Sequence, residues 1–256
     1  MKHILTILSI VFCFTITAQE NNHYEQLFQE ANQLYQQNDF AGAQSTFESI
    51  LAAGINSSEL YYNLANCYYK TGAIPNAILY YEKALKLTPN DPDIAFNLSL
   101  ANQQTTDKIE PLPKIFYETW WNTLIRSASL HTWTILSILV CCLMAASLLL
   151  FLLSQSESLN RISFYSGIVT LLFFNVSFFA AFSLTKRMNE SSTAIVFTAS
   201  LNVKSAPAGN STNLFVIHEG TKVNLLQTNG NWIEIALEDG NKGWRSEEHT
   251  SELQSQ

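Results

Sequence analysis

The residue types that carry out chemistry in proteins are sparse in this chain and form no recognised catalytic pattern. Away from both ends of the chain, the histidines are His23, His131 and His218, one in each region. Neither metal-ligand spacing nor a nucleophile motif accompanies them. The acids Asp91 and Asp93 stand in a turn, where carboxylates usually face solvent. The sequence therefore predicts no catalytic residue, no cofactor and no metal site, and we do not expect an enzyme.

The four cysteines offer no redox pair in soluble structure. Cys13 lies in an apolar N-terminal segment, and Cys141 and Cys142 lie in a long apolar run. Cys67 is thus the one thiol expected in a soluble domain, which excludes a disulfide framework there. Because it follows Ala65 on an expected helix, we predict that Cys67 packs in a core and is not reactive.

A stripe of acidic, aromatic, amide and tyrosine side chains is the best candidate for a binding site. Its members are spaced by three, four and three residues, so they share one face of a helix, and the same types recur 34 residues later. Such a face can stack on an extended peptide and bind its backbone through the amides; the alternative is that the rings only pack between helices. The candidate peptide-binding groove comprises Glu25, Phe28, Asn32, Tyr35, Glu59, Tyr62, Asn66, Tyr69 and Lys70, with a weaker third set at Asp93, Phe96, Leu100 and Gln103.

The elements that position this stripe follow the same 34-residue period. In the second copy, small, aromatic, glycine and proline residues at fixed offsets resemble the tetratricopeptide consensus: Leu64, Ala65, Tyr68, Gly72, Ala77, Tyr81, Ala84 and Pro89. The first copy departs from it at Glu30, Asn38 and Ile55. The resemblance implies stacked antiparallel helix pairs with a concave face. We expect repeats at 24–57 and 58–91 and a capping helix at 92–107.

The charge of this region restricts its partners. Between Gln19 and Asp107 the sequence has ten acidic residues against three lysines. This excess of negative charge argues against nucleic acid as a partner. Only Lys70 is basic near the stripe, so a clamp for peptide carboxylates is not evident. A neutral or basic peptide segment is the expected ligand.

Three apolar stretches indicate a membrane protein. Residues 1–18 contain a short apolar segment preceded by Lys2, and we predict that they are a cleaved signal peptide. The alternative is a lipoprotein anchor at Cys13, but the bulky Phe12 stands where lipoprotein processing requires a small residue. Residues 130–153 and 162–184 are long enough to span a bilayer and are joined by the short loop 154–161. An aromatic-rich linker and interfacial segment is expected at 108–129. Asn175, the one strongly polar residue of the second span, is expected to bond a neighbouring helix.

Two signals disagree about the orientation of this hairpin. A signal peptide exports the repeat domain, and a short loop then returns the chain to the same side, which places both soluble domains in the periplasm. Positive charges argue the opposite, since Arg126, Lys186 and Arg187 flank the outer ends and the loop holds only Arg161. We favour export, because the signal peptide commits the N-terminal domain first.

The C-terminal region has short alternating apolar runs separated by turns, which predicts a small all-β module. One string of residues and several single positions after it resemble bacterial SH3-like domains, which implies such a domain over 193–244. They are the string 201–207 and Gly220, Thr221, Val223, Trp232, Gly243 and Trp244. Residues 245–255 look like the translation of a sequencing-adapter oligonucleotide, and the segment 245–256 is therefore interpreted as an adapter artefact; a solvated natural tail is the alternative. We therefore expect that the natural chain diverges after Trp244 and that the final strand of the domain is missing from this sequence.

The domain order resembles that of the BatE proteins of Bacteroidetes aerotolerance operons: signal peptide, tetratricopeptide repeats, two spans and a C-terminal SH3-like domain. The expected fold class is a multidomain membrane protein with an all-α array, a transmembrane helical hairpin and a small all-β barrel lacking its last strand. The resemblance implies a scaffold in the bacterial inner membrane that works beside von Willebrand A-type membrane partners. The alternative is a cell-wall-binding or targeting subunit of an envelope hydrolase or sensor system.

Overall fold

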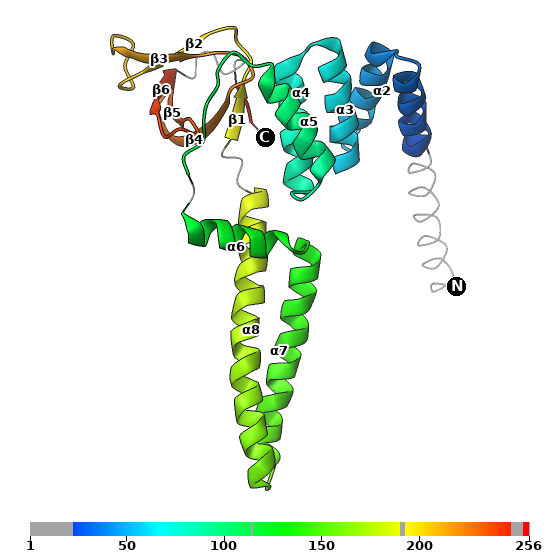
Figure 1. Ribbon diagram of the computed structural model, residues 1–256, viewed down its shortest axis with the longest axis vertical. Helices are drawn as coiled ribbons and strands as arrows, with labels where there is room; N and C mark the ends of the chain where they lie inside the picture. The colour runs from blue at the N-terminus through cyan, green and yellow to red at the C-terminus, as the bar shows by residue number, and fades with distance from the viewer. Residues whose placement is uncertain (1–22, 114, 190–192, 247–252, 256) are drawn as a thin grey trace, which may run out of the picture. The chain divides into compact units, whose positions relative to one another are not determined.

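The computed structural model describes residues 23–113, 115–189, 193–246 and 253–255, so the signal peptide predicted at 1–18 lies outside the described residues. The chain divides into two compact units. Residues up to Leu112 and from Ser192 onward form one, here called the repeat–sheet unit, and Pro113–Ser191 form the other, the hairpin unit. Figure 1 shows both units, and each is described by itself below.

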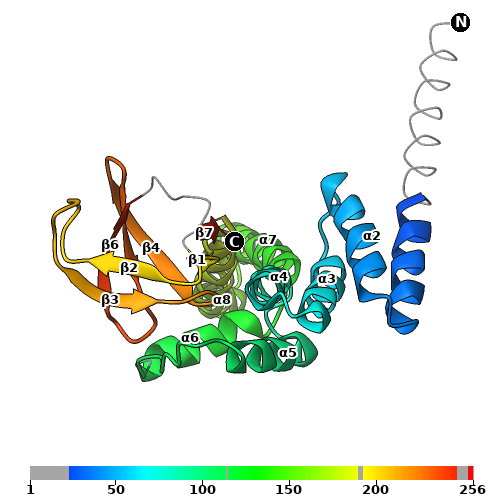
Figure 2. The ribbon, with the colours of Figure 1, turned by 90° about the horizontal axis from the view of Figure 1, so that it is seen from above.

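The first part of the repeat–sheet unit is a helical array, which confirms the all-α repeat predicted from the 34-residue period (Figure 2). Its core is formed by small and aromatic residues at the consensus positions, among them Ala65, Ala77 and Tyr81, all nearly inaccessible to solvent. The helices span residues 23–36, Phe40–Ala52 (α2), Ser58–Thr71 (α3), Ile74–Leu87 (α4) and Pro92–Gln103 (α5).

Local sequence signals set the ends of these helices. Asp39, Ser57 and Asp91 accept hydrogen bonds from backbone N–H groups at the starts of α2, α3 and α5, which satisfies donors that have no partner within the helix. Gly72 ends α3 with a φ of 84°, a conformation that glycine adopts without strain. In the first repeat Asn38 takes the equivalent role with a φ of 64°. Asparagine tolerates this region better than most residues, so the departure from the consensus at Asn38 does not prevent the fold.

The β region of the repeat–sheet unit is one antiparallel sheet with strand order β3-β2-β6-β5-β4-β1-β7. This arrangement agrees with the predicted all-β module, and Figure 1 labels six of its strands, β1 to β6. Its core contains Val196, Val203, Val223 and Ile235. Along 201–204, the buried Leu201 and Val203 alternate with more exposed residues. The strands are Thr193–Val196 (β1), Leu201–Lys204 (β2), Asn213–Ile217 (β3), Lys222–Asn229 (β4), Trp232–Ala236 (β5), Lys242–Ser246 (β6) and Leu253–Ser255 (β7).

Parts of the tail at 245–256 pair with this sheet. The strand β6 begins at Lys242 and includes Gly243 and Trp244, and Arg245 and Ser246 continue it opposite Ile233 and Trp232. The backbone of β7 pairs with β1. Strand pairing uses backbone groups that nearly every residue carries. The pairing is therefore compatible both with a natural tail and with a translated adapter. The adapter origin stays a prediction, which genomic codons for this tail would contradict.

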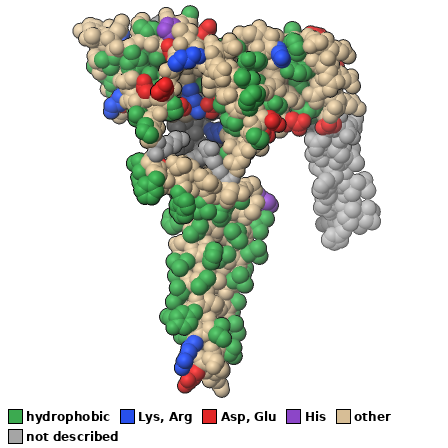
Figure 3. All heavy atoms as spheres, viewed as in Figure 1, with side chains coloured by type: hydrophobic (Ala, Val, Ile, Leu, Met, Phe, Trp, Pro, Cys, Tyr) green, Lys and Arg blue, Asp and Glu red, His purple; other side chains and the backbone are tan. Residues whose placement is uncertain are grey.

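The hairpin unit consists of α6 (Phe116–Arg126), α7 (Leu130–Leu153) and α8 (Glu157–Asn189). Both α7 and the segment Glu157–Lys186 of α8 are long and apolar enough to cross a membrane. Hydrophobic side chains cover the visible face of the two helices (Figure 3). α8 begins at Glu157, within the loop predicted at 154–161, because Glu157 suits the positive end of a helix and forms an i,i+4 pair with Arg161 at 3.7 Å.

Small polar residues line the contact between α7 and α8. Ser147 Oγ donates to the backbone oxygen of Ser163 at 2.6 Å, and Ser147 and Ser166 hydroxyls lie 2.7 Å apart. Small side chains let two helices approach closely, and hydroxyls find partners between them. At the other end, Trp133 Nε1 donates to the oxygen of Ile125 at 3.0 Å, which ties α6 to α7.

The helix α6 is amphipathic, as the interfacial segment was expected to be. Ile125 is buried against α7 and α8, and Trp121 packs beside it. On the other side, Phe116, Tyr117 and Trp120 expose more than half of their surface. Exposed aromatic rings of this kind are typical of a helix lying at a membrane surface.

Candidate functional site

The groove predicted on the first helices of the repeats is crossed by two equivalent asparagine bridges. Asn63 Nδ2 donates to Asn32 Oδ1 at 3.2 Å, and Asn97 Nδ2 donates to Asn66 Oδ1 at 3.1 Å. Each bridge joins the first helix of one repeat to the first helix of the next. Both acceptors use their amide oxygen, which leaves the amide nitrogens of Asn32 and Asn66 to donate to a ligand. The spacing of these two donors is the 34 residues of the repeat.

Tyr81 further orients Asn66. Its hydroxyl donates to Asn66 Oδ1 at 2.5 Å. Burial raises the pKa of Tyr81, so the hydroxyl keeps its proton at physiological pH and acts as the donor. Asn63, Asn97 and Tyr81 were not predicted as part of the site. The 34-residue spacing between Asn63 and Asn97 is the sequence signal that could have identified that pair.

Aromatic side chains occupy the same repeat position three times, at Phe28, Tyr62 and Phe96. The ring of Phe28 meets Phe47 edge-on at 5.4 Å, and the ring of Tyr62 lies 6.0 Å from that of Tyr81. Both are partly buried, so they pack between helices and also face outward. Phe96 is 61% exposed. The weaker third set predicted on α5 thus presents the most open ring of the three.

The remaining predicted groove residues divide by exposure. Glu25, Glu59 and Lys70 are exposed, and Glu25 accepts a hydrogen bond from Gln29 in its own helix at 2.9 Å. Tyr35 is partly buried and packs against the ring of Phe40 at 5.1 Å. Tyr69 is also partly buried, against the helical core. The charged groups thus lie at the rim of the candidate groove, and the tyrosines also support its wall.

Cys67 has the structural role predicted for it. Its side chain is inaccessible to solvent within the helical core. Burial raises the pKa of the thiol to about 12, so it is protonated and a poor nucleophile at neutral pH. Within the described residues, no group of three or more His, Cys, Asp and Glu side chains could hold a metal ion.

The array and the sheet are connected by contacts that the sequence did not predict. Ile195 of β1 is fully buried and belongs to the core of the helical array, whereas its neighbours Ala194 and Val196 belong to the core of the sheet. Lys222 Nζ of β4 bonds Glu82 Oε1 of α4 at 2.7 Å. We call this set of contacts the junction. The junction lies at the C-terminal end of the array, where the sequence predicted no second helix to pair with α5.

Asp107 is the centre of the polar part of the junction. Its carboxylate accepts from the backbone N–H of His218 at 2.6 Å and from the Thr221 hydroxyl at 2.7 Å, and it lies 2.8 Å from His218 Nδ1. Burial alone would raise the pKa of Asp107, but the hydrogen bonds from His218 and Thr221 outweigh it and hold the pKa below the usual value. The ionised carboxylate of Asp107 therefore stabilises the contact between the array and the sheet.

This shift predicts how the stability of the unit depends on pH. A depressed folded-state pKa contributes stability above the unfolded value, about 3.9 for Asp, and that stability is lost as pH falls through the folded value. We expect Asp107→Asn to lower the unfolding free energy by about 1–3 kcal/mol at pH 7 and to reduce the loss of stability that the natural residue shows as the pH falls below the ordinary pKa of an aspartate. Denaturant titrations at several pH values measure both effects. The control is Asp93→Asn on exposed α5; equal pH profiles for the two variants would contradict this role of Asp107.

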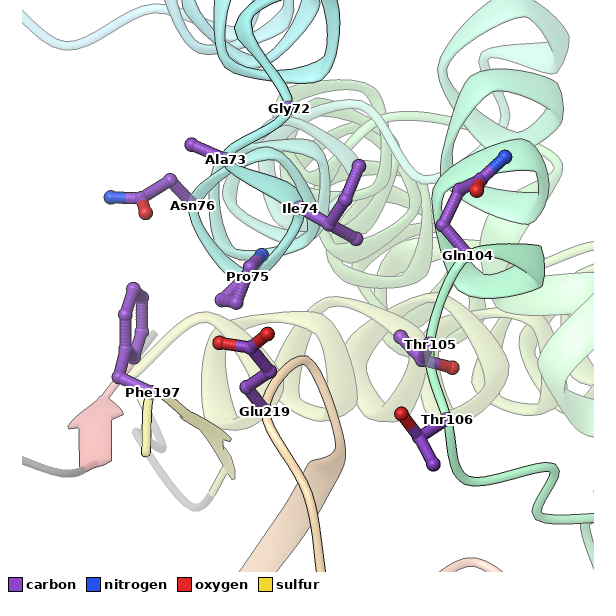
Figure 4. A pocket seen from close by; sticks show the side chains of 10 residues that line it. All are labelled: Gly72, Ala73, Ile74, Pro75, Asn76, Gln104, Thr105, Thr106, Phe197 and Glu219. Carbon is purple, nitrogen blue, oxygen red and sulfur yellow. The ribbon is translucent and has the colours of Figure 1, made fainter. Parts of the chain in front are cut away.

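A pocket of about 270 Å³ lies beside the junction (Figure 4). It is lined by the α3–α4 turn, by the chain after α5 and by Phe197 and Glu219 of the sheet region. Among the lining residues Glu219 is the only ionisable one, and its side chain is exposed. Water satisfies an exposed carboxylate, so the groove remains the better candidate for ligand binding.

Comparisons with known proteins agree with both soluble folds. Residues 28–92 match the tetratricopeptide repeat family, and residues 199–251 match the bacterial SH3 domain family. The chain carries both domains. Such domains are typically interaction modules that bind proteins, peptides or cell-wall material. The comparison with curated proteins found no match.

Proposed function

We propose that this protein is a membrane-anchored scaffold that holds partner proteins through its tetratricopeptide groove and its SH3-like domain. The observation that carries the proposal is the repeated asparagine bridge, which orients the amide groups of Asn32 and Asn66 one repeat apart. Asn97 of the second bridge also bonds the Tyr62 hydroxyl, and the ring of the adjacent Phe96 is exposed. Donors at regular spacing suit the backbone of an extended segment, and the rings suit its side chains. The acidic array favours a neutral or basic segment.

The location we propose is the bacterial inner membrane, with both soluble domains in the periplasm. The support is the predicted signal peptide together with two apolar helices joined by a three-residue turn, Ser154 to Ser156. In this orientation Glu238→Cys is labelled by an impermeant maleimide in cells with a permeabilised outer membrane, and Ser154→Cys is labelled only after lysis. The reverse pattern would contradict the orientation without affecting the groove.

The partners we propose are membrane or periplasmic proteins, including von Willebrand A-type Bat proteins, as the domain order suggests for aerotolerance complexes. The support is the order of domains alone. The SH3-like domain favours a second candidate, a cell-wall-binding or targeting subunit of an envelope hydrolase or sensor system, because bacterial SH3 domains bind cell-wall peptides in other proteins.

Crosslinking in intact cells followed by mass spectrometry of the purified full chain separates these functions. A scaffold yields crosslinked peptides from envelope proteins that map to the first helices of the repeats. Recovery of peptidoglycan fragments without protein partners would contradict the scaffold and favour the cell-wall function. The matched control is the same experiment on a chain with Tyr62→Ala and Phe96→Ala, in which the protein crosslinks are lost.

A further inference from the structure

The hairpin unit carries a polar amide on a surface that is otherwise apolar. Asn175 of α8 is exposed, and its Nδ2 donates at 2.7 Å to the backbone oxygen of Leu171 in the same helix. The sequence predicted a hydrogen bond from Asn175 to a neighbouring helix, but α7 is not that neighbour. One N–H and the amide oxygen of Asn175 are left to bond a group outside this chain.

The position of Asn175 along α8 places it near the middle of the apolar segment. It lies 14 residues after Arg161 and 11 before Lys186, which at the helical rise is about 21 Å and about 16 Å. A bilayer hydrocarbon core is about 30 Å thick. If these charges lie at the two surfaces, the amide is close to the centre, where lipid offers no hydrogen-bond partner.

The side of α8 that carries Asn175 faces away from α7. The helix meets α7 through the buried Ser163, Ser177 and Ala180. Asn175 is two positions from Ser177, which is about 200° around a helix. Phe179, one turn from Asn175, is 52% exposed. The amide and its apolar neighbours therefore form a surface that only lipid or another helix can cover.

We propose that Asn175 joins two copies of this chain in the membrane, α8 against α8, with the amide oxygen of each accepting from the amide nitrogen of the other. This rests on the membrane hairpin of the proposed function. Copies of one chain insert in the same orientation, so both Asn175 side chains lie at the same depth. An amide has a donor and an acceptor, and is thus complementary to itself about a twofold axis. A helix of a different protein could make this contact only if it carried a polar group at the same depth in the membrane, whereas a second copy of this chain always does.

Disulfide crosslinking of the full chain in native membranes tests this contact. In a Cys141→Ala, Cys142→Ala background, Phe179→Cys reports on the proposed face and Phe173→Cys on the opposite side of α8. We expect a crosslinked dimer from Phe179→Cys and none from Phe173→Cys. Adding Asn175→Leu is expected to lower the dimer yield about tenfold, whereas Asn175→Gln, which keeps the amide, retains it.

Three outcomes would overturn the proposal, and they differ from a failure of the membrane hairpin. Absence of the Phe179→Cys dimer from protein that resists carbonate extraction would show that this face of α8 does not meet a second copy of the chain. An unchanged yield in Asn175→Leu would show that the amide is not the contact. Equal yields from both cysteine positions would indicate random collision. Release of the protein by carbonate would instead refute the spanning hairpin, and the contact with it.

Discussion

The double variant Tyr62→Ala, Phe96→Ala is expected to bind its partner segment at least about 100-fold more weakly than the natural chain. Both rings line the candidate groove, and aromatic anchors at the centre of an interface each contribute about 2 kcal/mol or more. Two such losses multiply in the dissociation constant. Quantitative pull-down or titration with a partner identified by crosslinking measures the change.

Two controls separate a loss of binding from a loss of folding. Leu87→Ala removes an exposed apolar side chain of α4, away from the first helices, and is expected to leave binding unchanged. Tyr62→Phe keeps the ring but removes the hydroxyl that accepts from Asn97 at 2.9 Å, so we expect a smaller loss. If the double variant keeps its helical circular dichroism and binds normally, the groove is not the site.

Replacing Ile195 with aspartate is expected to separate the sheet from the array. Ile195 is fully buried in the helical core, and a carboxylate there would lie without a partner in an apolar environment. We expect a loss of about 3 kcal/mol or more in the stability of the repeat–sheet unit. Because Ala194 and Val196 keep their places in the core of the sheet, the sheet itself is expected to remain folded.

Limited proteolysis and thermal unfolding of the full chain in detergent measure this effect. In the variant, we expect cleavage in the segment 104–112 and two separate unfolding transitions. Leu226→Asp makes the same change at a side chain of β4 that is 52% exposed, and we expect it to be nearly neutral. If Ile195→Asp and Leu226→Asp unfold indistinguishably, the array and the sheet do not stabilise each other.

The fold was predictable where the signals are local. The 34-residue period and the small, aromatic and glycine positions of the second repeat predict helices, turns and core together, because each residue type has its own physical role at its position. Alternation of apolar residues likewise predicts the strands. The start of α8 was less predictable, since Glu157 and Arg161 are polar yet suit the first turns of a helix.

The junction could not be predicted, because its contacts join residues far apart in sequence. Asp107 and His218 are separated by 111 positions, and Glu82 and Lys222 by 140. Neither pair belongs to a pattern that a single sequence reveals. The candidate groove is intermediate: its aromatic and amide stripe follows from helical spacing, but the bridge from Asn97 to Asn66 depends on how neighbouring helices align.

Site-specific photocrosslinking tests the scaffold most directly. A photoreactive amino acid replaces Phe96 in the groove of the full chain, and in a parallel chain it replaces Leu87 outside the groove, with irradiation in intact cells. We expect a discrete envelope protein attached at position 96, little or none at position 87, and loss of the adduct when Tyr62→Ala and Asn66→Ala are added. Equal adducts at both positions, or an adduct at position 96 that survives those changes, would contradict it.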